Sequence, residues 1–249
     1  MWLCLHYQDI FVGHKGFWRI NRKAMYYETY MRQQKNWKKW PDDVSIDEIH
    51  RLLQFVPEWN PKYKGESDQS LLDIFYEIRP TVKEFYFEKL ENAQFDSEYL
   101  QKIKGIFDKV ARYKNSYESN DASKILHIII PNLFVMWDNK IREGVLGKAN
   151  KKKGSMYALD FLPIMQKELL EAVETCMKEE KLEKVEAVNF IRKKCGNESL
   201  PKLVYEHNYC VFSKTGEFKN YLEKINAKDE VSMDVFMRLF EKMLEVQEN

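Results

Sequence analysis

Apolar side chains recur every three or four residues along most of this 249-residue chain, and residues that start or stop helices separate one apolar stretch from the next. The run Ser45-Ile46-Asp47-Glu48 has the spacing of a helix-capping box, and Pro57 is expected to end the helix that follows. Similar stripes predict a helix from about Ser70 that stops at Pro80, and a further helix from Thr81. Alternation typical of strands is almost absent. The sequence therefore predicts an all-α globular array, with at most a small N-terminal hairpin at 11–17.

The same pattern continues to the C-terminus, and it predicts helices near residues 97–110, 119–130, 138–147, 155–176, 182–195, 218–225 and 233–244. The run at 125–130 is apolar except for His127, so it belongs in a core. A buried strand is the alternative there, because three consecutive isoleucines favour a strand. The lysine-rich stretch 148–154 is expected to be a loop. It divides the chain into lobes 1–147 and 148–249, or lies within one continuous domain.

The charge balance does not indicate a dedicated binder of polyanions, because 40 basic and 39 acidic side chains give a net charge of +1. Residues 1–40 are more basic, with eight cationic and two anionic side chains. Aromatic rings alternate with these cations over 14–40, which suits stacking on nucleic acid and contact with phosphate. The alternative is an amphipathic helix whose rings pack on the core. Lys148, Lys151, Lys152 and Lys153 offer the same choice between phosphate contact and a solvated loop.

Membrane, metal and cofactor signals are weak. The mean hydropathy is −0.59 and no apolar run approaches the ~18 residues of a membrane span, so no membrane partner is expected. The five histidines and four cysteines lack ligand spacing, and no glycine-rich phosphate loop occurs, so neither metal nor cofactor is expected. The cysteines are expected to be buried, reduced thiols. The N-terminus does not read as a secretory signal, and a cytoplasmic location is expected.

The most informative stretch joins the apolar helix to the next one. Lys124 is a cation near the start of that helix, and Asp138 is placed to cap the following helix. Both are therefore expected at the rim of the core, on consecutive helices. The alternative is purely structural: Lys124 extends to solvent past apolar neighbours, and Asp138 only satisfies backbone amides, which is worth about 1 kcal/mol.

This arrangement resembles the core of helix-hairpin-helix DNA glycosylases over about residues 95–147. Lys124 matches the lysine that begins a buried helix in that superfamily, and Trp137-Asp138-Asn139-Lys140-Ile141 matches its aspartate motif. The hairpin glycines that approach a DNA phosphate would fall at Asn120 and Ala122, and the spacing from the lysine to the aspartate is shorter than usual in the family.

The resemblance implies a DNA glycosylase-like base-excision repair protein that binds double-stranded DNA. Lys124 would attack the sugar, and Asp138 would stabilise the sugar cation. The implied DNA contacts are Asn120, Ser123, Lys148, Lys151, Lys152 and Lys153, and the implied stacking and pocket residues are Trp137 and His127. The alternative is a non-catalytic helical protein that binds a protein partner or forms a homodimer. The sequence leaves open whether the chain is an enzyme.

A third segment, 200–209, places Glu206, His207 and Asn208 among apolar and aromatic residues. These polar side chains either line a pocket or lie where a helix ends in a loop.

Overall fold

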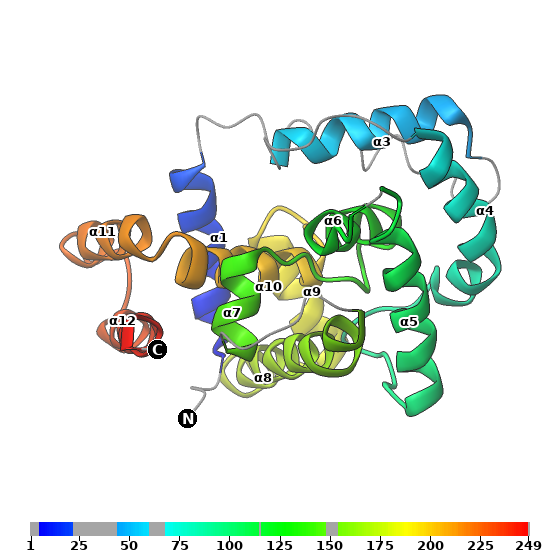
Figure 1. The fold of residues 1–249 in the computed structure, drawn as a ribbon. Helices are drawn as coiled ribbons and strands as arrows, with labels where there is room; N and C mark the ends of the chain where they lie inside the picture. The colour runs from blue at the N-terminus through cyan, green and yellow to red at the C-terminus, as the bar shows by residue number, and fades with distance from the viewer. Residues whose placement is uncertain (1–4, 22–43, 60–67, 115, 148–153, 249) are drawn as a thin grey trace. The chain divides into compact units, whose positions relative to one another are not determined.

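The structure, a computed structural model, describes residues 5–21, 44–59, 68–114, 116–147 and 154–248. Within these ranges it contains eleven α-helices, two π-helical segments and no strand, which confirms the all-α prediction (Figure 1). The helices divide into two compact units, and each unit combines stretches that are separated in sequence. We name each unit after its most buried helix and describe the two in turn.

The α6 unit contains α3 (Ile46–Trp59), α4 (Asp68–Phe85), α5 (Ser97–Val110), α6 (Ser119–Ile129) and the π-helical segment η2 (Met156–Phe161). Its core is aromatic: the rings of Phe107 and Tyr157 stack with centroids 4.2 Å apart, and Trp137 meets Tyr157 edge-on at 5.1 Å. The region 119–130, for which a strand was the alternative, is the helix α6. The helix prediction is therefore confirmed.

In the α6 unit, the predicted start of a helix at the capping box is confirmed, but the predicted helix ends at two prolines are not. The predicted capping box begins α3, because the Glu48 amide donates to Ser45 Oγ at 3.3 Å and the Ser45 amide to Glu48 Oε2 at 2.8 Å. The predicted stops were wrong. Pro57 lies inside α3, and Pro80 lies inside α4, which continues from Asp68 to Phe85. Residues Ile78, Val82 and Phe85 on both sides of Pro80 are buried, and this packing offsets the hydrogen bond that the proline removes.

The α10 unit contains α1 (Tyr7–Ile20), α7 (Asn139–Leu146), α8 (Leu162–Glu180) from Ile164 onward, α9 (Lys184–Lys194), α10 (Leu200–Asn208), the π-helical segment η3 (Tyr209–Ser213), α11 (Thr215–Asn226) and α12 (Met233–Glu248). Every residue of α10 is buried, and α1 packs along it. Figure 1 shows α11 and α12 as the last two helices of this unit.

The described N-terminal segment is helical and contains no hairpin. Residues 11–17, predicted as a hairpin if any strand existed, lie within α1. His6 and Asp9 form the capping box that starts this helix. The glycines allow close packing instead of a turn: a Cβ on Gly13 would lie 2.9 Å from His207 Cα, and one on Gly16 would lie 2.5 Å from the Phe218 ring.

Several predicted features lie outside the described residues, among them the loop lysines at 148 and 151–153 and the aromatic and basic segment from residue 22 to 40. Among the helices that the structure does describe, none combines the length and apolar character needed to cross a lipid bilayer.

Candidate functional site

Lys124 lies in α6, a helix that is almost entirely buried. Ten of the eleven residues of α6 are buried, and Lys124 itself is 5% exposed. Its neighbours Ile125 and Leu126 are fully buried. The long aliphatic stem of lysine suits this position, and the burial of α6 withdraws its amine from bulk water.

The residues around Lys124 tie the following segment back to α6. Ser123 Oγ donates to the Asn120 carbonyl at 2.8 Å and accepts the Trp137 amide at 3.1 Å. The Trp137 indole donates to the Ser119 carbonyl at 3.0 Å and is fully buried. The structure therefore brings Asn120, Ser123 and Trp137 together, with Ser123 and Trp137 inside the core of the α6 unit.

His127, the implied pocket residue, is also fully buried. Its Nδ1 lies 2.6 Å from the Phe134 carbonyl oxygen, so that nitrogen carries the hydrogen and donates. Nearby, the Tyr113 hydroxyl donates to Asp121 Oδ2 at 2.9 Å. Backbone carbonyls and a phenol thus satisfy several of the buried polar side chains of α6.

Asp138 caps α7, as the sequence predicted. Its Oδ1 accepts the Ile141 amide at 2.8 Å, and its Oδ2 accepts the Ser213 hydroxyl at 2.7 Å. Ser213 ends the π-helical segment η3, which packs against α7. Gly144 permits this packing, because a Cβ there would lie 2.1 Å from the Phe212 ring. Two donors from different elements therefore fix the carboxylate.

Lys124 and Asp138 belong to different units. Lys124 lies in the α6 unit, and Asp138 is the first residue of a stretch of the α10 unit. Asp138 is the N-cap of α7, which is the placement that the resemblance implies, whereas Lys124 lies at the sixth position of the buried helix α6 and does not begin it.

Of the buried charges of α10, the sequence pointed to Glu206 as a possible pocket residue but did not single out Lys202. Glu206 is fully buried, and Lys202 is 1% exposed. The Lys202 ammonium contacts Glu206 Oε1, lies 3.6 Å from Glu198 Oε1 and sits 5.0 Å from the Trp18 ring. His14 Nδ1, from α1, lies 2.6 Å from Glu206 Oε2. Burial alone would raise the pKa of Glu206, but Lys202 and His14 outweigh it and lower the pKa below its ordinary value.

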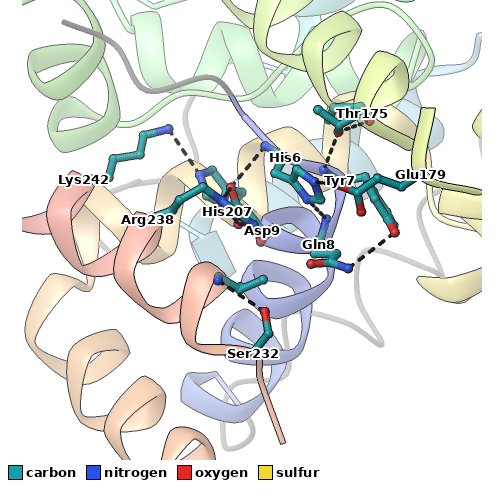
Figure 2. A network of polar contacts seen from close by, with 12 residues as sticks. His6, Tyr7, Gln8, Asp9, Thr175, Glu179, His207, Ser232, Arg238 and Lys242 are labelled. Atoms are coloured by element: carbon teal, nitrogen blue, oxygen red, sulfur yellow. Dashed lines mark hydrogen bonds and ion pairs between the residues drawn. The ribbon is translucent and has the colours of Figure 1, made fainter. Parts of the chain in front are cut away.

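Helix α10 also belongs to a second ionic cluster, of which Figure 2 shows His207 and Lys242 from close by. The Asn208 amide donates to Glu168 Oε2 of α8 at 2.9 Å, and Lys242 of α12 lies 3.6 Å from Glu168 Oε1. His207 Nε2 faces the Lys242 ammonium at 3.3 Å. The segment 200–209 therefore neither ends in a loop nor exposes these groups. It continues into η3 with Glu206, His207 and Asn208 fully buried.

A signal for these clusters does exist in the sequence. A lysine and a glutamate four residues apart, as at 202 and 206, usually mark a solvated helix face. Here the positions between them are Leu203, Val204 and Tyr205, and α1 carries glycines three residues apart. Apolar residues between the two charged positions, together with a glycine-bearing helix that can pack closely, indicate that the charged pair is buried.

Cys176, Cys195 and Cys210, the cysteines that the structure describes, are buried as free thiols. Burial raises the pKa of Cys176 to about 11 and that of Cys195 to about 12, so both remain protonated at neutral pH. Among the residues that the structure describes, no three histidine, cysteine, aspartate or glutamate side chains gather as metal ligands would.

Comparison with known proteins gives no match of any kind: no family model, no curated protein and no solved structure matches this chain.

Proposed function

We propose that the protein is a DNA-binding, DNA glycosylase-like protein of base-excision repair that acts through Lys124 and Asp138. One observation carries this proposal. Two consecutive helices bear, in order, a lysine in an almost entirely buried helix and a carboxylate that caps the next helix. This is the order that the resemblance to helix-hairpin-helix glycosylases implies. A cytoplasmic location is part of the same proposal.

The chemistry assigns a separate task to each group. The Lys124 amine attacks the sugar carbon that bears the base, the bond to the base breaks, and the base leaves with a proton. The sugar remains attached to the lysine nitrogen through C1′; the nitrogen gives up a proton, the C1′–O4′ bond of the ring breaks, and O4′ takes up a proton, which leaves the opened sugar as a Schiff base. A lysine kept from water reacts more readily, because its amine is more easily held in the neutral, nucleophilic form. Asp138 stabilises the positive charge that develops on the sugar, and it moves protons.

The target base would have to leave the stack to reach these groups. Asn120, which is partly exposed at the start of α6, would contact the backbone of the duplex. Lys148, Lys151, Lys152 and Lys153 would add phosphate contacts from outside the described residues. Trp137 has no stacking role in this proposal, because its indole is fully buried and donates to Ser119.

Borohydride trapping tests the proposal. The protein is mixed with duplexes that each carry one damaged base or an abasic site, and borohydride reduces any Schiff base to a stable adduct. We expect an adduct with wild-type protein and none with Lys124→Gln. Lys167→Gln is the matched control, since Lys167 has a side chain 76% exposed and should leave the adduct unchanged. A wild-type protein that forms no adduct with any duplex of the panel contradicts the proposal.

A second candidate function, a non-catalytic protein-interaction role, is favoured by the exposed face of α12. Met233, Met237 and Leu244 are 59%, 44% and 43% exposed, and their helical spacing places them on one side. A second copy of the chain could bury this stripe. Light scattering at increasing protein concentration tests this function: a dimer that Met237→Lys abolishes supports it, and a monomer at every concentration contradicts it.

A further inference from the structure

Helix α12 packs against its unit through buried apolar side chains such as Val235, Leu239 and Met243, and two cationic side chains add ionic contacts. Arg238 contacts Asp9 of α1, with its Nη2 3.1 Å from Asp9 Oδ1. Lys242, one turn further along, reaches His207 of α10 and Glu168 of α8. Figure 2 shows Lys242 extending from α12 to His207, with Arg238 beside Asp9. Both contacts therefore depend on the protonation state of the groups they meet.

The geometry fixes the charge state of His207 when α12 is docked. The imidazole is fully buried between two partners. Its Nδ1 lies 3.4 Å from the Asp9 carbonyl oxygen, and its Nε2 lies 3.3 Å from the Lys242 ammonium. A neutral ring with its hydrogen on Nδ1 fits both contacts, because Nδ1 donates to the carbonyl and Nε2 accepts from the ammonium. A second hydrogen on Nε2 would point at a cation.

The other charged groups around His207 are already paired. From α8, Glu168 is held between Lys242 and Asn208. Within α10, Glu206 is engaged by Lys202 and by His14 of α1. The carboxylate of Asp9 is engaged by Arg238, and α1 otherwise offers the Gly13 backbone, which is packed against His207. Burial, followed by the Lys242 charge, accordingly lowers the pKa of His207 well below 6.5.

We infer that α12 is an acid-released latch, docked while His207 is neutral and released when this imidazole takes up a proton. The undocked state lets the imidazolium reach water and separates it from Lys242, so each proton taken up there favours release. The inference goes beyond the proposed function and does not depend on it.

Asp9 acts in the opposite direction. Burial raises the pKa of Asp9 above 3.8, although Arg238 opposes this shift. The docked state therefore binds a proton at Asp9 more readily than the undocked state does, and this uptake favours docking in acid. Removal of the Asp9 charge should make the release by His207 steeper.

Amide hydrogen exchange tests the latch. Exchange across α12, residues 233–248, is measured by mass spectrometry from pH 7.5 to 5.5 and corrected for the intrinsic pH dependence of exchange. For a histidine of ordinary pKa in the released state, we expect protection of wild-type α12 to fall about tenfold over this range. In His207→Gln the fall should be absent, because glutamine can accept from Lys242 and donate to the Asp9 carbonyl without titrating.

Three further variants keep the outcome decisive. His50→Gln, a matched control at an exposed position on α3, should behave as the wild type does. Asp9→Asn should steepen the loss of protection. Lys242→Met removes the cation facing the imidazole and should weaken the dependence on pH, which provides a second test if His207→Gln does not fold. Equal acid-induced loss of protection in wild type and His207→Gln, or no loss in the wild type, would overturn the latch.

Discussion

Helices α6 and α10 are the two most buried helices of their units, yet they satisfy their polar side chains in different ways. In α6, Ser123 and His127 bind backbone groups of nearby residues, and Asp121 accepts from Tyr113 and lies 3.6 Å from the Lys114 ammonium. In α10, Glu206 meets His14 of α1, His207 meets Lys242 of α12, and Lys202 pairs with Glu206 within the helix. His14 and Glu206 are 192 residues apart in the sequence.

This difference separates two kinds of burial. The Ser123 hydroxyl does not titrate near neutral pH, so its hydrogen bonds to backbone groups should hold over a wide range of pH. A buried ion pair contributes only while both partners remain charged, and loss of one partner leaves the other charge desolvated. The α10 unit should therefore be the more sensitive of the two to acid and to substitutions that change charge.

The largest expected effect comes from breaking the ionic core. Glu206→Gln removes the carboxylate shared by Lys202 and His14 and leaves the Lys202 ammonium in the core, 3.6 Å from Glu198 Oε1. We expect the free energy of unfolding to fall by about 3–5 kcal/mol, measured by urea denaturation. The double variant Lys202→Met/Glu206→Leu should recover much of this loss. A loss below about 1 kcal/mol for Glu206→Gln would mean that the pair is solvated.

The close approach of α1 to α10 is tested by a smaller change. Gly13→Ala places a methyl group 2.9 Å from His207 Cα and should cost about 1–3 kcal/mol of stability. Gly105→Ala in α5 is the matched control, because nothing lies within 4 Å of its added Cβ. That substitution should stabilise the protein by about 0.4–1 kcal/mol. Similar thermal unfolding temperatures for the two variants would argue against tight packing at Gly13.

The pH dependence of stability gives a further test of the difference between α6 and α10. The folded protein keeps His207 neutral below its ordinary pKa of 6.5, while the unfolded chain binds a proton there. Stability should therefore fall as the pH drops below 6.5, by about 1.4 kcal/mol at pH 5.5 from this residue. Urea denaturation of wild type and His207→Gln at pH 7.5 and 5.5 measures the difference. The account expects the wild type to lose more stability than the variant between these two values.

The smallest effect is expected in α6. Ser123→Ala removes hydrogen bonds to Asn120 and Trp137 and should cost about 1 kcal/mol. Because no ionisable group is involved, the cost should be the same at pH 7.5 and at pH 5.5. A cost that changes strongly between these two conditions would remove the distinction drawn between the two helices.

The sequence predicted α6 and its flanking segment well because their determinants are local. The apolar run at 125–130 and the cap at Asp138 follow from neighbouring residues, and the structure has both. Pro80 failed as a stop because the burial of α4 on both sides of it depends on distant partners. The hydrogen bond from Ser213 to Asp138 could not be predicted either, because the two residues are 75 positions apart in the sequence.

The ionic core of α10 was missed for the same physical reason. Charge on a side chain normally indicates solvent exposure, and only the partners decide otherwise. The spacing of Lys202 and Glu206 is visible in the sequence, but His14 of α1 and Lys242 of α12, which meet Glu206 and His207, cannot be placed beside α10 by any local pattern. Residues 11–17 show the same limit, since their glycines resemble a turn and serve helix packing instead.

Lys124 in α6 and Lys202 in α10 are both buried, and together they give the most direct test of the functional account. After borohydride trapping on DNA that carries an abasic site, proteolysis and mass spectrometry locate the lysine that holds the sugar. The account predicts the adduct on Lys124, the lysine that the resemblance matches to the attacking one, and not on Lys202. An adduct on any other amine, or no adduct at all, would contradict it.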